Sequence, residues 1–401
     1  MATYEPEQKI LSKYADVLIK FALNSGDGVK KDEVVVLVVP DIAKPLLKEL
    51  QRAVLESEAH PVVRMYPTGM DRQFYELASD EQLKFFPKKY KKAFVDLIDH
   101  QVGIIGDVNL KELDGIDPHR IVLSQEARKK TREWLEDKEY KGNFTWTLGL
   151  YGTSAYAKEA GMSLEGYWGE IIRACYLDKK DPVGEWKKIL KAQERVKAKL
   201  DKLNIESLKI EGEDIDLTVK LGEKRRWLGG SGRNIPSYEL FISPDWRGTE
   251  GYIKFNQPLF MYGNKIEDIE LWFEKGKVVK ADASKNLKLL EKMIERKNAD
   301  KVGEFSLTDK KFSRIHKFMA NTLYDENVGG GYGNMHIALG LAYKESYTGD
   351  IKSMKKSDWK KAGFNQSPEH KDIINTQRKT VTATLKSGKK IMIYRDGEFL
   401  V

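Results

Sequence analysis

The chain has 401 residues, of which 41% are hydrophobic and 32% charged, with a formal net charge of +8. This composition is that of an ordinary globular protein with a sizeable core, and its length fits two domains. The single cysteine, Cys175, excludes an intrachain disulfide. No window approaches 18 uninterrupted apolar residues, and the charged N-terminus lacks the apolar core of a signal peptide. We therefore expect a cytoplasmic protein that does not contact membrane.

In the first half of the chain, apolar runs alternate with helical patterns. Residues 32–40, DEVVVLVVP, form a continuous β-branched run that is typical of a strand buried on both faces of a parallel sheet. Further strands are predicted over 60–67 and 101–109, and helices over 41–59, 79–100 and 124–140. This alternation predicts an α/β domain with a mostly parallel open sheet over residues 1–203. The half contains neither a G-x-G-x-x-G fingerprint nor a P-loop, so nothing in it supports nucleotide binding.

In the second half, the pattern changes after a charged helix predicted over about 183–203. Strands with hairpin signals are predicted within 205–222, 248–263, 266–282 and 380–401. We therefore predict a β-rich α+β domain over residues 204–401, with the boundary near residue 203.

Two histidines of the second half lie beside residues suited to metal binding. His336 follows a glycine-rich loop and begins the stretch HIALGLAY, which we interpret as a helix capped by Asn334. Tyr343, seven residues on, would then share a helix face with His336. His370 and Asp372 are two residues apart, so in an extended chain both side chains point to the same side.

Several acids complete a candidate metal site. Glu239 and Glu304 enter apolar segments, where a carboxylate should be paired or bound to a metal. Glu326 follows Asp325 just before the glycine-rich loop. Three Glu, one Asp and two His suit two adjacent divalent ions, and such nitrogen and oxygen ligands accept Zn, Co, Mn or Mg. The other four histidines, interpreted as core or surface residues, are His60, His100, His119 and His316.

Several segments resemble, in the same order, motifs of the M29 family of metalloaminopeptidases, the aminopeptidase T group. They are TSAYAKEAGMSLEGYWGEIIRACY, NIPSYELFISP, TEGYIKFNQPLFMYGNKIEDIELWFEKGKVV, VGEFSL, NTLYDEN, HIALGLAY and SPEHKDIINT. The resemblance implies a peptidase with six metal ligands, namely Glu239, Glu304, Glu326, His336, His370 and Asp372. It also implies that Glu304 bridges the two ions and that Tyr343 is an active-site tyrosine. The resemblance further implies a homodimer whose C-terminal faces enclose the active sites and admit short peptides.

The expected function is removal of N-terminal residues from short peptides by a water molecule activated between two ions. Glu304 or another acid would move the proton, and Tyr343 would stabilise the oxyanion.

The residues alone leave other functions open. One is a two-metal hydrolase of a phosphoester or a non-peptide amide. They also leave open a non-enzymatic protein that binds through a basic surface. The basic run 86–94 is interpreted as a helix start, so no nucleic-acid partner is expected. The insertion Gly329–Asn334 places Glu326 ten residues before His336, farther than in the family, which leaves a disabled second metal site as a further alternative.

Overall fold

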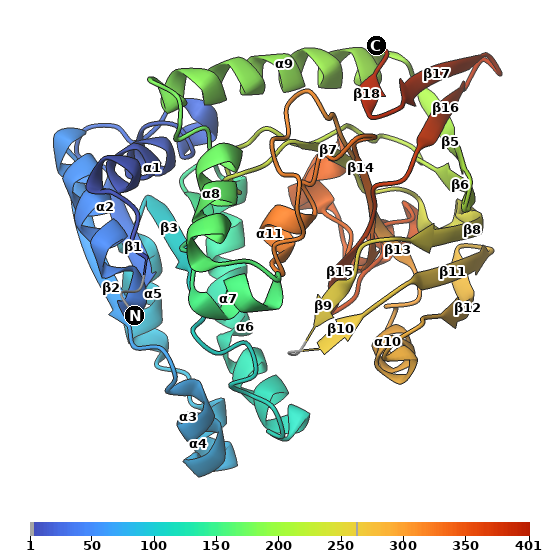
Figure 1. The fold of residues 1–401 in the computed structure, drawn as a ribbon. Coiled ribbons are helices and arrows are strands. Elements are labelled where there is room, and N and C mark those ends of the chain that lie inside the picture. The colour runs from blue at the N-terminus through green and yellow to red at the C-terminus, as the bar shows by residue number, and fades with distance from the viewer. Residues whose placement is uncertain (1–3, 262–263) are drawn as a thin grey trace. The chain divides into compact units, whose positions relative to one another are not determined.

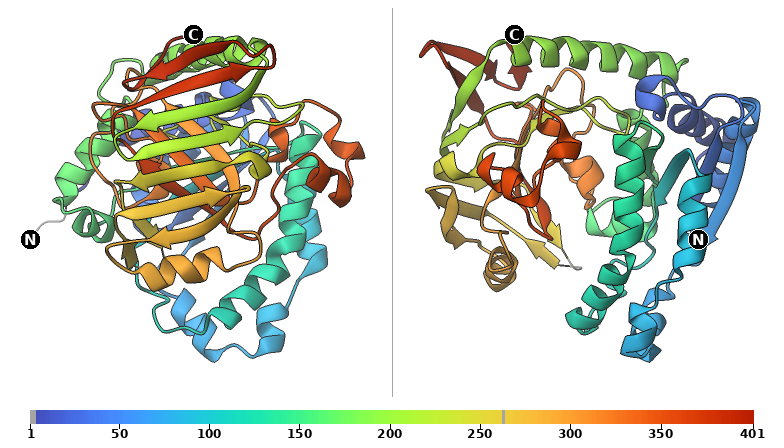
Figure 2. Two further views of the ribbon diagram at one scale, coloured as in Figure 1. Left: turned by 90° about the vertical axis from the view of Figure 1, so that its right-hand side faces the viewer. Right: turned by 180° about the vertical axis from the view of Figure 1, so that it is seen from behind.

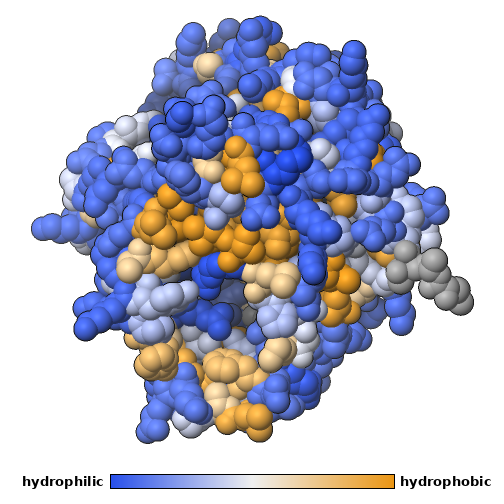
Figure 3. All heavy atoms as spheres, turned by 90° about the vertical axis from the view of Figure 1, so that its left-hand side faces the viewer, coloured by the Kyte–Doolittle hydropathy of each residue, from blue (hydrophilic) through white to orange (hydrophobic). Residues whose placement is uncertain are grey.

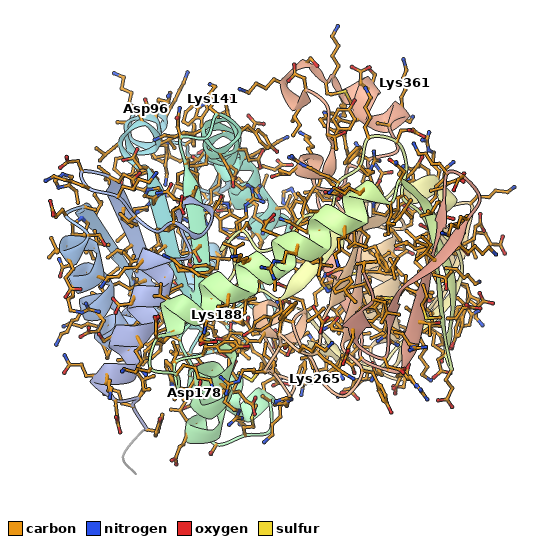
Figure 4. All side chains as sticks on the ribbon, turned by 90° about the horizontal axis from the view of Figure 1, so that it is seen from above. Asp96, Lys141, Asp178, Lys188, Lys265 and Lys361 are labelled. Atoms are coloured by element: carbon orange, nitrogen blue, oxygen red, sulfur yellow. The ribbon has the colours of Figure 1, made fainter. Side chains whose placement is uncertain are left out.

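The computed structural model describes residues 4–261 and 264–401. The chain packs as two compact units, one comprising Met1–Lys187 and Ser231–Pro236, the other Lys188–Gly230 and Ser237–Val401. The chain passes from the first unit to the second inside helix α9 (Pro182–Lys202), on which Lys188 is labelled in Figure 4. The boundary predicted near residue 203 follows the end of this helix. Residues 262–263, the end of the predicted strand segment 248–263, lie outside the described residues.

The first unit is built on a four-stranded parallel sheet in the order β2-β1-β3-β4 (Figure 1). Its strands are β1 (Val34–Pro40), β2 (His60–Tyr66), β3 (His100–Ile105) and β4 (Thr145–Leu150). In β1, Val35, Val36 and Leu37 are consecutive and fully buried, as a strand covered on both faces requires. The predicted parallel open sheet is confirmed. Strand β4 was not predicted from the sequence, because Thr, Trp and Gly interrupt its apolar pattern.

The helices of the first unit are α1 (Gln8–Lys20), α2 (Lys44–Glu56), α3 (Asp71–Leu77), α4 (Asp80–Lys84), α5 (Lys88–Leu97), α6 (Pro118–Tyr140), α7 (Ser154–Glu159) and α8 (Leu164–Ala174), with 3₁₀ turns η1 (Asn24–Gly26) and η2 (Asp41–Ala43). The single helix predicted over 79–100 is wrong, because the chain leaves the helical conformation between α4 and α5. Pro87 explains the break: it has no N–H to donate, and it disfavours a helical conformation at Phe86.

Exposed hydrophobic side chains are concentrated in one stretch of the first unit. Most of the large exposed ones among the described residues lie between Ile42 and Val108, and they include Val63 and Met65 of the edge strand β2. Figure 3 views the side on which α2 and β2 lie in Figure 1, and hydrophobic residues gather on this face beside a hollow. None of the helices among the described residues is long and apolar enough to cross a membrane.

The second unit contains a large antiparallel sheet, seen face-on in the left view of Figure 2, in the order β12-β11-β8-β6-β5-β16-β17-β18. Its strands are β5 (Ile205–Gly212), β6 (Ile215–Lys220), β8 (Glu250–Phe255), β11 (Ile269–Glu274), β12 (Lys277–Asp282), β16 (Lys379–Leu385), β17 (Lys390–Arg395) and β18 (Glu398–Phe399). The hairpins β5–β6, β11–β12, β16–β17 and β17–β18 are antiparallel. The predicted β-rich character of the second half is confirmed.

A second, four-stranded antiparallel sheet has the order β15-β14-β13-β7. It consists of β7 (Glu239–Ile242), β13 (Val302–Thr308), β14 (Asn334–Gly340) and β15 (His370–Asn375). A single buried cluster contains side chains of both sheets, among them Phe305 and Ile337 of the small sheet and Leu208 and Leu217 of the large one. The other face of the small sheet is therefore left to carry polar side chains, because successive residues of a strand point to opposite faces.

The remaining elements of this unit are the hairpin β9 (Leu259–Met261) and β10 (Asn264–Ile266), the helices α10 (Leu287–Ile294), α11 (Thr322–Asp325) and α12 (Lys356–Lys361), and the 3₁₀ turns η3 (Trp246–Gly248), η4 (Lys344–Ser346) and η5 (Ile351–Ser353). The helix predicted from His336 to Tyr343 is wrong, and so is its cap at Asn334, because this segment forms strand β14. All seven residues of β14 are buried, and a strand buried on both faces lacks the alternation that distinguishes it from a buried helix.

Candidate metal centre

The register of the small sheet brings distant residues of the sequence onto one face. Glu304 of β13 pairs with Ala338 of β14, which pairs with Asp372 of β15. Two residues along each strand, and so on the same face, Ser306 pairs with His336. Because Ala338 has only a methyl side chain, no bulky side chain separates the acids on its two sides, Glu304 and Asp372.

Three buried side chains form a first cluster of possible ligands, Glu239, Glu304 and His336. The Nε2 atom of His336 lies 3.0 Å from Oε1 of Glu304 and 3.2 Å from Oε2 of Glu239. Its Nδ1 atom is buried and has no hydrogen-bond partner among the described residues. The imidazole therefore directs one nitrogen at two carboxylates.

A second cluster consists of Glu304, His370 and Asp372. The Nε2 atom of His370 lies 3.4 Å from Oδ1 of Asp372 and 3.8 Å from Oε2 of Glu304. The Nδ1 atom is 2.8 Å from the carbonyl oxygen of Leu341, to which it donates a hydrogen bond that fixes the ring. Glu304 belongs to both clusters, with one oxygen toward each histidine. This is the arrangement of a carboxylate placed between two cation positions.

The pKa values of these groups reflect crowded negative charge in a buried place. Burial, aided by the charges of Glu304 and Asp372 and opposed by the charge of His336, raises the pKa of Glu239 to about 7. Burial alone would lower the pKa of His336, but its hydrogen bond to Glu304 and the charge of Glu239 raise it to about 9. The pKa of His370 is likewise raised to about 9 against the effect of burial, mainly by Asp372. Burial opposes the ionisation of Asp372, yet the neighbouring His370 lowers its pKa to about 2.

The donor set fits divalent metal ions. In each cluster the candidate ligand atoms lie within 4.8 Å of one another, which is close enough to surround one ion. The donors are imidazole nitrogen and carboxylate oxygen, which suit Zn, Co or Mn. Three acids and two histidines also concentrate more negative than positive charge, and a cation would neutralise the excess.

Tyr343 lies beside the second cluster although it is not on a helix. Its ring centroid is 4.8 Å from that of His370 and 5.7 Å from that of Phe241. Its backbone N–H donates to Oγ of Ser243 at 2.8 Å. Burial, followed by the charges of Glu304 and Asp372, raises the pKa of Tyr343 well above its ordinary value. The phenol therefore keeps its proton at neutral pH and can donate a hydrogen bond.

Glu326 is buried and lies near the site, but it is not a member of either cluster found among the described residues. Its charge contributes to the raised pKa of Tyr343, which places it within electrostatic range of that phenol. Asn327 joins its segment to β7: the Oδ1 atom accepts from the backbone N–H of Tyr238 at 2.6 Å, and Nδ2 lies 3.4 Å from Oε1 of Glu326. The structure thus brings five of the six predicted ligands together and holds the sixth beside them.

Asp325, the other acid of this segment, has a structural role. Its carboxylate accepts the backbone N–H groups of Met319, at 2.6 Å, and Asn321, at 2.9 Å. These hydrogen bonds fix the backbone that leads into α11.

Three further residues near the site, Ser306, Ser243 and Asn327, were not predicted from the sequence. Ser306 alone carried a usable signal, since it lies two residues after Glu304 and so on the same face of a strand.

The sequence matches the family described as Thermophilic metalloprotease (M29) over residues 7–399. It is 27% identical to aminopeptidase AmpS of Bacillus subtilis, with 97% of this chain and 98% of that protein aligned. It is 25% identical to aminopeptidase T of Thermus aquaticus, with 98% of each chain aligned. The structure of wild-type AmpT from Thermus thermophilus superposes with a TM-score of 0.84 at 23% identity, covering 98% of this chain and 100% of that one. The chain therefore belongs to the M29 family of metalloproteases.

Proposed function

We propose that the protein is a metal-dependent aminopeptidase whose two divalent ions are held by Glu239, Glu304, His336, His370 and Asp372. The observation that carries the proposal is the pair of ligand clusters that share Glu304. The relatives named as aminopeptidases, which align over nearly the whole chain, support the reaction class. Glu326 is proposed as a further ligand that completes one coordination shell, since it is buried beside the same tyrosine.

When bound, the two ions supply Lewis-acid activation of water and of the peptide carbonyl. The chain itself supplies the remaining parts. Leu341 fixes the ring of His370 through its carbonyl oxygen, so Nε2 stays directed at the ion position. Tyr343, protonated at neutral pH, donates a hydrogen bond to the oxygen that gains negative charge as the peptide carbonyl is attacked. Either Glu304 or another acid beside the site receives the proton of the attacking water and passes it to the leaving amine.

Reconstitution of the metal-free enzyme tests the function. Protein stripped with a chelator is supplied with Zn, Co, Mn or Mg, and hydrolysis of leucyl-p-nitroanilide is compared with that of the N-acetylated substrate and of p-nitrophenyl phosphate. We expect cleavage of the substrate with a free amine only, and only after an ion is restored. Cleavage of the phosphate ester alone would instead assign the site to the alternative two-metal hydrolase.

We also propose that the protein acts on short peptides as a homodimer, as the family resemblance implies. Sedimentation at micromolar concentration should give twice the mass of the 46.0 kDa chain. A series of leucyl peptides of increasing length should show kcat/KM falling as the peptide grows. A monomer that cleaves long and short peptides equally well would contradict this part of the proposal.

A further inference from the structure

Ser306 occupies a central place on the polar face of the small sheet. It lies on β13 two residues after Glu304, and it pairs with His336 of β14 on one side and Phe241 of β7 on the other. Its side chain is fully buried. A buried hydroxyl needs a hydrogen-bond partner, because water cannot reach it to compensate the lost hydration.

The partner of this hydroxyl is Glu239. The Oγ atom of Ser306 lies 3.0 Å from Oε2 of Glu239. The same oxygen, Oε2, lies 3.2 Å from Nε2 of His336. An ionised carboxylate only accepts hydrogen bonds, so Ser306 is the donor. Glu239 therefore has one oxygen fixed between a hydroxyl and an imidazole.

We infer that Ser306 is a positioning residue that holds the carboxylate of Glu239 in the orientation required to bind a metal ion. A glutamate side chain has several rotatable bonds, and repulsion from Glu304 favours conformations that turn it away from the cluster. A neutral donor restrains the carboxylate without adding a charge that competes with the ion. The inference deepens the proposed function and rests on it, because it assumes that Glu239 is a ligand.

A neighbouring hydroxyl provides the contrast. Thr308 pairs directly with Glu239 across β13 and β7, and its side chain is also buried. Its Oγ1 atom nevertheless has no hydrogen-bond partner among the described residues. Proximity to Glu239 along the sheet is thus not sufficient for the contact. Ser306, the diagonal neighbour, makes the contact, and Thr308 serves as a matched control.

The test measures metal affinity on purified full-length protein with Zn²⁺, by competition with a chromophoric chelator, beside kcat and KM on leucyl-p-nitroanilide. For Ser306→Ala we expect the affinity for one of the two ions to fall about 10-fold, the lower end of the usual range for a residue that supports a ligand. With Zn²⁺ saturating, kcat should recover while KM stays unchanged. Thr308→Val should bind as the wild type does, and Ser306→Thr, which keeps the hydroxyl, should restore affinity.

A parallel variant separates this inference from the proposed function. Glu239→Gln should lose one ion per chain. If it does, while Ser306→Ala binds both ions with wild-type affinity, the role of Ser306 is disproved and the proposed site stands. If Glu239→Gln retains both ions, Glu239 is not a ligand, and the inference on Ser306 fails together with that assignment. Circular dichroism of each variant confirms that the binding data come from folded protein.

Discussion

The two units each bury a histidine, and their surroundings differ. In the first unit, Nδ1 of His100 lies 2.8 Å from Oγ1 of Thr145, and Nε2 lies 2.8 Å from Oε2 of Glu33. One hydroxyl and one acid satisfy both nitrogens. In the second unit, Nε2 of His336 has carboxylate oxygens of Glu239, Glu304 and Asp372 within 3.8 Å, while Nδ1 has no partner among the described residues.

This difference separates a structural histidine from a candidate metal ligand. Both ring nitrogens of His100 have a hydrogen-bond partner. The residue links the N-terminal ends of β3 and β4 to Glu33, the residue before β1. His336 lies where negative charge exceeds what imidazoles can balance. Burial by itself therefore does not identify a functional histidine, whereas an excess of acids around one of its nitrogens does.

The largest effect should come from removing a histidine at the metal centre. His370→Ala deletes one ligand of the second cluster, and the remaining acids cannot hold that ion alone. We expect kcat/KM on leucyl-p-nitroanilide to fall by about 10³-fold or more, with one ion lost per chain by elemental analysis. Full activity of this variant after dialysis against a chelator would show that His370 is not a metal ligand.

A smaller loss is expected when the hydroxyl that donates a hydrogen bond to the oxyanion is removed. Tyr343→Phe keeps the ring that packs on His370 but deletes the hydroxyl. We expect kcat to fall by about 10²-fold, the lower end for loss of an oxyanion donor, with ion content unchanged. A variant with normal kcat but raised KM would show that Tyr343 binds substrate without stabilising the transition state.

Removal of the structural histidine, His100, should lower stability without changing the metal content. His100→Ala leaves Glu33 and Thr145 without their common partner. Because two hydrogen bonds are lost and a cavity replaces the buried ring, we expect a loss of about 2 kcal/mol in the free energy of unfolding, measured by urea denaturation. The ion content and kcat of the folded variant should equal those of the wild type. Loss of an ion here would overturn the division of roles.

The smallest effect concerns pH. The folded-state pKa values of His336 and His370, about 9, exceed the ordinary 6.5, so the folded metal-free protein binds more protons than the unfolded chain between these values. The stabilisation that these two histidines contribute is fully present below pH 6.5 and should be lost as the pH rises through 9. We expect the melting temperature of metal-free protein to fall by about 5 °C over this range. His336→Gln should flatten this dependence, and His60→Gln, on an exposed residue, should not.

Local signals in the sequence predicted much of the fold. The β-branched run of β1 and the turn between β11 and β12 each carry their own pattern, and both were recognised. The segment from His336 was assigned to a helix because β14 is uniformly buried and shows no period of two. Pro87 is a helix breaker, but the helical pattern on both sides of it led to the prediction of one continuous helix.

The candidate site was predictable only in part. Residue chemistry and the family motifs pointed to Glu304 and His336, but sheet register determines which oxygens meet which nitrogens. Register depends on pairing between strands far apart in the sequence, such as Thr308 of β13 with Glu239 of β7, which no local pattern encodes. Ser306 and Asn327 were missed because a serine or asparagine gives no sign of its partner until the backbone places the two together.

The raised pKa values of His336 and His370 also bear on how the centre binds its ions. In the metal-free protein, protons on the two imidazoles balance part of the negative charge of the carboxylates, a role that the ions take over when they bind. Binding of the metal ions is then an exchange of ions for protons, and alkaline pH favours it. Acid, which returns protons to the two imidazoles, should therefore release the ions.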